Sequence, residues 1–122
     1  MQPCILKTKP ETEYYFDEGC FILELANSTA DGALSIARAR VLAGKTTQWH
    51  QLNNTIERYV ILSGQGVVEI GTLAAQEVNA GDVVIIPAQC RQRITNCGSE
   101  DLIFLALCTP RFELVNYNPV ND

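Results

Sequence analysis

The sequence lacks the features that would place it in a membrane or on a nucleic acid. No apolar stretch approaches the roughly 18 residues that a membrane-spanning helix needs, and the opening segment MQPCILKTKPETE lacks the apolar run of a signal peptide. The 9 Lys and Arg residues are spread singly against 14 Asp and Glu, so no basic stripe faces a row of phosphates. We therefore expect a cytoplasmic protein whose partners include neither a membrane nor a nucleic acid.

Cysteine spacings typical of structural zinc sites or disulfide frameworks are also missing. The 5 cysteines are odd in number and contain no C-x-x-C pair. Reduced thiols are the simplest expectation. Cys97 and Cys108 are interpreted as small structural hydrophobic residues.

The chain does contain enough apolar sequence for one compact domain. Its 122 residues are 47% hydrophobic and 19% charged, which is typical of a globular protein and unlike a disordered chain. A chain of this length can remove about two thirds of its unfolded surface from water. We predict that residues 1–122 form a single domain.

Short strands with turn signals between them dominate the pattern. Residues 34–42 (LSIARARVL) alternate between two faces, as a half-buried strand does. Segments 56–62 and 67–70 are rich in β-branched residues and are joined by SGQG, in which Gly64 can take a positive φ. These two segments are predicted to form a hairpin.

The rest of the chain repeats this scheme, and no stretch shows a sustained helical period. One or two strands are expected within residues 13–25, and the tail 110–122 is expected to be an irregular cover. The further strand candidates are residues 75–78, 83–87, 91–96 and 102–109. Many short strands in succession predict an all-β fold, an antiparallel sandwich or barrel.

Two sets of spaced residues resemble the paired motifs of the cupin family. The first family motif is a Gly, five residues, a His, one residue, a His, three or four residues, a Glu, six residues and a Gly. Here it reads Gly44, KTTQW, His50, Gln51, Leu52, NNTI, Glu57, RYVILS, Gly64. The second motif, a Gly, five residues, a Pro, one residue, a Gly, two residues, a His, three residues and an Asn, is matched by Gly81, DVVII, Pro87, Ala88, Gln89, CR, Gln92, RIT, Asn96. The resemblance covers about residues 34–109 and implies a cupin-like antiparallel β-barrel, or jelly roll.

The resemblance also implies a metal site from which this sequence departs. In the family, the two His and the Glu of the first motif and the His of the second bind one divalent metal inside the barrel. Here the second His position is Leu52, the last is Gln92, and the second-motif glycine is Gln89. The resemblance therefore implies a degenerate site in which His50, Glu57 and Gln92 hold a divalent metal, with zinc, iron, nickel, copper and manganese as candidates.

Strand alternation predicts where these side chains lie. Residues two apart share a face, so His50 points to one side of its strand and Trp49 to the other. If the barrel closes as the family's does, His50, Glu57 and Gln92 meet in the lumen with Tyr59 beside them. Glu57 and Tyr59 are the predicted catalytic residues. Either a metal or a hydrogen bond must join His50 to Glu57, because an unpartnered buried carboxylate is costly.

Some neighbouring side chains have structural interpretations. Arg38 and Arg40 are expected on the outside of their strand, since the small residues between them suit a crowded barrel interior. Cys90 has the parity of Gln92 and can approach the pocket.

The aromatic residues outside the motifs suggest a subunit contact. Trp49, Phe112 and Tyr117 can cover an outer sheet face, and Pro110 ends the last strand so that Phe112 can lie over the barrel mouth. A homodimer is the predicted assembly.

Two classes of function remain open from the sequence. The first is a metal-dependent enzyme of the dioxygenase, isomerase or lyase type acting on a small molecule. The alternative is a metal-free module that binds or senses a small molecule in the lumen. The fold hosts many unrelated activities and does not choose between them.

Overall fold

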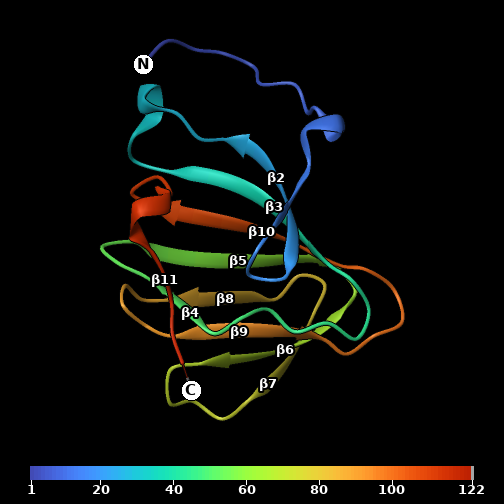
Figure 1. Cartoon of the computed structure of the whole chain (residues 1–122). Coiled ribbons are helices and arrows are strands. Elements are labelled where there is room, and N and C mark those ends of the chain that lie inside the picture. The colour runs from blue at the N-terminus through green and yellow to red at the C-terminus, as the bar shows by residue number, and fades with distance from the viewer. Residues whose placement is uncertain (122) are drawn as a thin grey trace.

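A computed structural model describes residues 1–121, and its regular structure is almost entirely strand (Figure 1). Only three short 3-10 turns interrupt the strands in this part of the chain: η1 (Pro10–Thr12), η2 (Thr29–Asp31) and η3 (Leu114–Asn116). The strands are β1 (Tyr14–Phe16), β2 (Cys20–Ala26), β3 (Ser35–Val41), β4 (His50–Leu52), β5 (Ile56–Ser63), β6 (Gln65–Ile70), β7 (Gln76–Asn79), β8 (Val83–Ile86), β9 (Gln92–Asn96), β10 (Leu102–Thr109) and β11 (Tyr117–Pro119).

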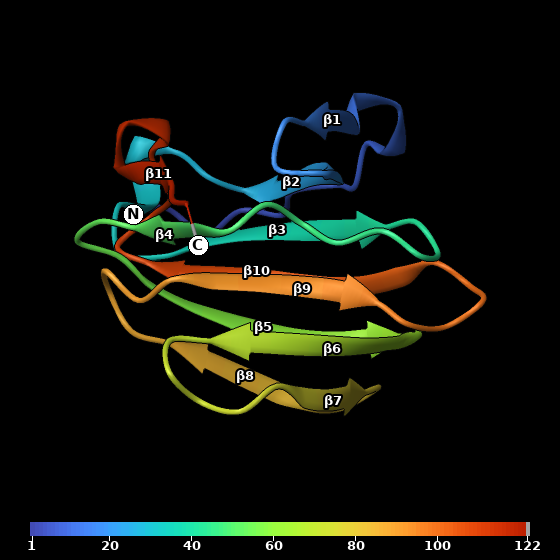
Figure 2. The same ribbon diagram turned by 60° about the horizontal axis from the view of Figure 1, so that its bottom comes forward.

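The strands form two sheets that lie against each other (Figure 2). The larger sheet has the order β1-β2-β3-β10-β5-β8, and the smaller has the order β11-β4-β9-β6-β7. Paired strands run antiparallel, so the predicted all-β jelly roll is confirmed. No helix within residues 1–121 is long and apolar enough to cross a membrane.

Alternation along the strands determines which side chains enter the space between the sheets. On β5, Glu57, Tyr59 and Ile61 are buried while the residues between them are not. On β9, Gln92 and Ile94 are buried in the same alternating way. Since β5 belongs to the larger sheet and β9 to the smaller, the two rows face each other across the barrel.

The glycines of the two motifs occupy backbone conformations that other residues rarely adopt. Gly44, Gly64 and Gly81 have φ of 78°, 90° and 94°. Gln89, which stands at a glycine position of the family motif, has a φ of 62°. The motif therefore keeps its backbone shape at this turn even where glycine is replaced, at a cost in local strain.

The tail differs from the irregular cover expected from sequence. Tyr117 to Pro119 form β11, which pairs with β4 so that Tyr117 lies opposite Leu52 and Pro119 opposite His50. Three residues ending in proline are too short for a recognisable alternating pattern, and Pro119 sits on the outermost strand of its sheet, where a missing N–H is tolerated.

At the turn between β5 and β6, Gly64 lies close to the backbone at the start of β10. A Cβ on Gly64 would lie 2.7 Å from the carbonyl oxygen of Asp101 and 2.9 Å from Cα of Leu102, both backbone atoms. Gly64→Ala should therefore lower the free energy of unfolding by about 2 kcal/mol or more, from the clash together with the positive φ. Urea unfolding followed by Trp49 fluorescence measures the loss.

Two matched variants separate the contributions. Gly44→Ala adds strain at positive φ without a neighbour within 4 Å, and we expect a loss of about 1 kcal/mol. Gly32→Ala has neither problem and should be nearly neutral. Equal urea midpoints for the Gly64 and Gly32 variants would contradict the close approach of this turn to β10.

Candidate functional site

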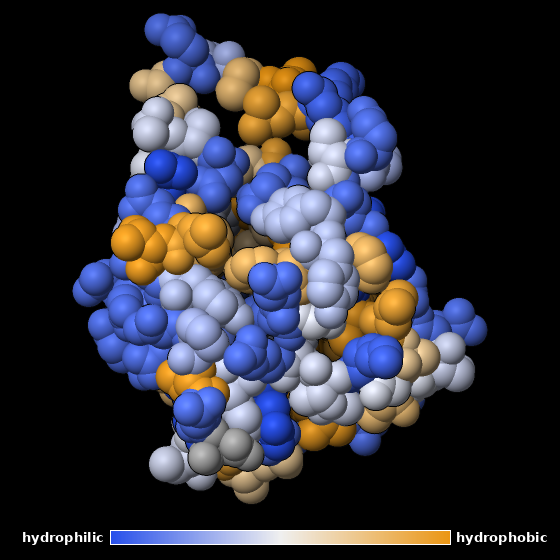
Figure 3. Space-filling view, in the orientation of Figure 1, coloured by the Kyte–Doolittle hydropathy of each residue, from blue (hydrophilic) through white to orange (hydrophobic). Residues whose placement is uncertain are grey.

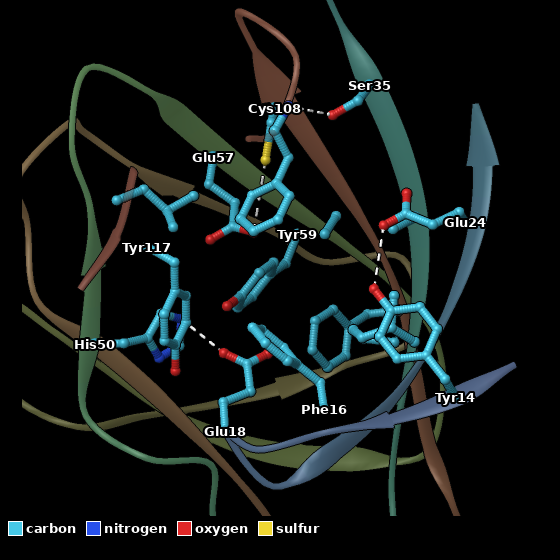
Figure 4. Close-up of a pocket in the computed structure, with 17 residues that line it drawn as sticks. Tyr14, Phe16, Glu18, Glu24, Ser35, His50, Glu57, Tyr59, Cys108 and Tyr117 are labelled. Carbon is cyan, nitrogen blue, oxygen red and sulfur yellow. Dashed lines mark hydrogen bonds and ion pairs between the residues drawn. The ribbon is translucent and has the colours of Figure 1, made fainter. Parts of the chain in front are cut away.

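A cavity lies between the two sheets, and the β1–β2 hairpin and the C-terminal segment contribute side chains to its lining (Figure 4). The space between its walls and the open solvent at its mouth together amount to about 550 Å³. The lining residues are Tyr14, Phe16, Glu18, Ile22, Glu24, Ser35, Ala37, Ala39, His50, Leu52, Glu57, Tyr59, Phe104, Ala106, Cys108, Phe112 and Tyr117.

His50, at the start of β4, is held from both ring nitrogens. Nδ1 lies 2.7 Å from the carbonyl oxygen of Gln48, which can only accept, so Nδ1 carries a hydrogen. Nε2 lies 3.2 Å from Oε2 of Glu18. This contact is an ion pair when the imidazole is protonated. The ring also stacks on Tyr117, with centroids 5.1 Å apart.

Glu57, on β5, is held by a short chain of hydrogen bonds. The amide nitrogen of Gln92 donates to Oε1 of Glu57 at 2.9 Å, and the Tyr59 hydroxyl donates to the amide oxygen of Gln92. The Cys108 thiol makes a longer contact of 3.8 Å with Oε2. Every side chain in this series of hydrogen bonds is buried, and every one has a hydrogen-bond partner, as buried polar groups generally do.

Burial makes Glu57 an unusually weak acid. It raises the pKa of the carboxyl to about 7, with the negative charge of Glu18 adding to the effect. His50, the Gln92 amide and the Cys108 thiol act in the opposite direction and do not overcome burial. The pKa of Tyr59 is raised well above its usual value, chiefly by burial, so this hydroxyl stays protonated near neutral pH.

The predicted site residues come together, although their connections differ from those expected. His50, Glu57 and Tyr59 line the cavity, and Leu52 forms part of its wall. Gln92 is fully buried behind Tyr59 and Glu57. The direct His50–Glu57 hydrogen bond that we considered is not formed among these described residues. His50 is bound to Glu18 and Glu57 to Gln92.

Three of the lining residues that were not expected at the site from sequence contact His50 or Glu57. Glu18 lies in the turn before β2, and no spacing rule connects it to His50. Tyr117 was placed on an outer face, which is wrong, because it lines the cavity and stacks on His50. Cys108, interpreted as purely structural, contacts Glu57. Its position was available from strand alternation, since it has the same parity as the buried Phe104 on β10.

The donor atoms of the predicted metal ligands are already engaged with one another. Nε2 of His50 faces Glu18, the amide nitrogen of Gln92 donates to Glu57, and the amide oxygen of Gln92 accepts from Tyr59. Within residues 1–121, no group of three or more His, Cys, Asp and Glu side chains is arranged to hold a metal ion. This donor set does not fit a resident divalent ion.

The remaining flanking residues lie away from the cavity. Arg38 and Arg40 bind Glu13 on the outside of β3, as expected, at 3.4 Å and 2.6 Å. The Trp49 ring is covered by the guanidinium groups of Arg91 and Arg93, which lie 3.9 Å and 4.3 Å from its centroid.

The predicted homodimer was based on three aromatic residues that were expected on one outer face. Phe112 lines the cavity, which agrees with the expected place over the mouth, so Trp49, Phe112 and Tyr117 do not form one outer surface. The face in Figure 3 is mostly hydrophilic, with hydrophobic residues in separate patches. The homodimer stays a prediction.

Comparison with known proteins places the chain among barrels of this architecture. A family model described as a cupin domain matches residues 37–108. None of the curated proteins compared with the sequence matches it.

Solved structures with the same fold include proteins of several activities. KdgF from Halomonas superposes with a TM-score of 0.79 at 14% identity, covering 92% of this chain and 97% of that one. Pac13, described as a nucleoside dehydratase, gives 0.76 at 19% identity over 94% and 90%, and a variant of Streptomyces PAC13 solved with uridine gives 0.78 at 18% identity over 99% and 93%. A predicted oxalate decarboxylase from Thermotoga maritima gives 0.77 at 23% identity over 88% and 99%. At these identities the likeness shows the fold alone.

The raised pKa of Glu57 predicts a pH-dependent stability. Its usual pKa of 4.5 applies to the unfolded chain, so between pH 4.5 and about 7 the unfolded state releases a proton that the folded state retains. As pH rises through this interval, the titration of Glu57 therefore lowers the free energy of unfolding by about 3 kcal/mol. The contribution of Glu57 to stability is complete only below pH 4.5. Glu57→Gln removes the titration.

Urea unfolding of the parent and of Glu57→Gln at a series of pH values measures this difference. The variant should gain on the parent as pH rises from 4.5 to 8. Glu77→Gln, at an exposed position on β7, should follow the parent throughout. A constant difference between parent and Glu57→Gln would show that Glu57 titrates normally in the folded protein.

A second variant tests whether the donor set limits metal binding. Leu52 lines the same cavity as His50, so Leu52→His supplies a second imidazole where the family has one. We expect zinc to bind this variant about tenfold or more tightly than the parent, as judged by calorimetric titration. Leu52→Gln is the matched control. Equal zinc affinity in all three proteins would mean that position 52 does not reach the ligand cluster.

Proposed function

The chain belongs to the cupin family, and from this premise we propose that its cavity performs acid–base chemistry on a small molecule without a resident metal, as an isomerase or lyase. One observation carries the proposal. A buried carboxyl with a pKa of about 7 and an imidazole whose Nε2 lies 3.2 Å from Oε2 of Glu18 line the same cavity. A carboxylate base and an imidazole acid are groups that such reactions use.

The two groups have complementary roles in the proposed reaction. Ionised Glu57 takes a proton from a substrate carbon, and His50 delivers the Nε2 proton to the oxygen that leaves. In a lyase the C–H and C–O bonds break, a C=C bond forms, and water departs. In an isomerase the proton is returned to another carbon and no group leaves.

Other residues position these groups. Tyr59 was predicted to be catalytic, but its hydroxyl is committed to Gln92, so we assign it a positioning role. Through the Gln92 amide it fixes the orientation of the Glu57 carboxyl. Glu18 orients the His50 ring through its contact with Nε2.

Similar structures support this class of chemistry. Pac13 is described as a nucleoside dehydratase, and a dehydratase removes water. The metal-dependent enzyme implied by the family resemblance is less well supported, because the hydrogen bonds of His50 and Gln92 occupy the atoms that a metal would need.

A metal-free binding module is the second candidate, and one observation favours it. The Tyr117 hydroxyl is buried in the cavity wall without a hydrogen-bond partner among the described residues. A ligand oxygen or nitrogen placed there would satisfy it, whether or not a reaction followed.

Proton exchange at carbon distinguishes these possibilities. A panel of small β-hydroxy carbonyl compounds is incubated with the protein in D₂O containing a chelator, and deuterium incorporation and loss of water are followed by NMR. The parent should catalyse one or both, and Glu57→Gln should lower the rate by about 10²-fold or more. Glu77→Gln should leave it unchanged.

The outcomes separate three functions. Activity that survives the chelator and disappears in Glu57→Gln supports metal-free acid–base chemistry. Activity abolished by the chelator and restored by a divalent metal supports the metal-dependent enzyme. Compounds that bind in the cavity without exchange or elimination leave only the binding module.

A further inference from the structure

The cavity lining contains three acids and, as its one basic side chain, His50. Glu18, Glu24 and Glu57 all contribute to its lining, from the turn before β2, from β2 and from β5. No Lys or Arg side chain of residues 1–121 is part of that lining. Figure 4 shows the three carboxylates on different sides of the space, around the ring of Tyr59.

The nine basic side chains are all occupied or exposed elsewhere. The arginines pair with acids, hydroxyls, amides or the indole ring outside the lining, and the lysines are on the surface. Their places are Arg38 and Arg40 at Glu13, Arg58 at Thr109, Arg91 and Arg93 at Trp49, Arg111 at Asn27, and Lys7, Lys9 and Lys45 in exposed positions. None of them is placed to neutralise a carboxylate in the cavity.

Two of the three acids lack a cationic partner. Glu18 has His50 at 3.2 Å, but Glu57 is bound only by the uncharged Gln92 amide and the Cys108 thiol. Glu24 accepts a hydrogen bond from the Tyr14 hydroxyl at 3.4 Å and has no cationic partner within residues 1–121. The lining therefore contains more acidic than basic side chains.

The walls around these acids are aromatic. Aromatic faces carry partial negative charge and attract cations, and this attraction grows when water is excluded. The aromatic lining residues are Tyr14, Phe16, Tyr59, Phe104, Phe112 and Tyr117. Carboxylates and aromatic faces thus both favour a positively charged ligand.

We infer that the cavity selects a small molecule that carries a protonated amine on an apolar or aromatic body, and that it excludes carboxylates and phosphates. The ammonium group is placed near Glu57 or Glu24, and the body packs against the aromatic wall. An anionic ligand would find no arginine fork in this lining, and the acids without a cationic partner would repel it. This inference rests on the proposed small-molecule site and names its ligand class.

Three probes that share one ring test the charge preference. Benzylamine, benzyl alcohol and benzoate are titrated into the full chain at about pH 8 with a chelator present, and binding is followed by NMR shifts of the cavity aromatic residues. We expect benzylamine to bind at least tenfold more tightly than benzyl alcohol and benzoate to bind most weakly. Benzoate binding equal to or tighter than benzylamine would overturn the inference, as would equal binding of amine and alcohol or no binding of any probe.

Variants identify the acids responsible. Glu57→Gln and Glu24→Gln should each reduce the ratio of benzylamine to benzyl alcohol affinity several-fold, while Glu77→Gln should leave it unchanged. Glu24 is exposed, so its variant keeps the test valid even if Glu57→Gln folds poorly. An unchanged ratio in both cavity variants would contradict the assignment.

The test is independent of the proposed reaction because it measures binding alone. An amine preference without proton exchange on any substrate would support this inference and refute the acid–base enzyme. Proton exchange with a preference for anionic compounds would do the reverse.

Discussion

The buried carboxyl of Glu57 is the constraint around which the interior is arranged. A carboxyl in the middle of a barrel must find a partner, and here that partner is the amide of Gln92 on the opposite sheet. Tyr59 completes the arrangement by taking the other end of the amide, which fixes how the amide is turned. A neutral side chain therefore satisfies Glu57 at the position where the family has an imidazole, and it brings no positive charge.

His50 and Glu18 form a second, separate unit in the same cavity. Leu52 removes the neighbouring imidazole of the family pattern, and Glu18 from the turn before β2 becomes the partner of His50. The substitutions at positions 52 and 92 thus fit together physically. One makes the wall apolar, the other binds the carboxyl, and the remaining histidine is held by an acid from outside the motif.

The positions of side chains on regular strands were predictable from the alternation of the sequence, and the positions of residues in loops were not. Alternation along the strands placed His50, Glu57 and Gln92 inside and Arg38 and Arg40 outside, because residues two apart in a strand must share a face.

Glu18 and Tyr117 escaped prediction because their positions depend on how the two ends of the chain fold over the barrel. Strand alternation does not apply to a residue in a turn, such as Glu18. The three residues of β11 are too few for an alternating pattern that would show which way Tyr117 faces. The pairing of β11 with β4 is what brings this ring onto His50. Motif spacing alone therefore located the cavity but not the residues that complete it.

The missing positive charge connects the two proposals. A basic side chain beside Glu57 would stabilise its charged form and hold its pKa low. No Lys or Arg of residues 1–121 lines the cavity, and burial raises the pKa of Glu57 to about 7. A ligand that brings its own ammonium group would supply the absent charge and favour the ionised carboxyl at the moment of binding. Near pH 7 the substrate itself would then shift Glu57 from a mixture of its two forms toward the ionised form that accepts a proton.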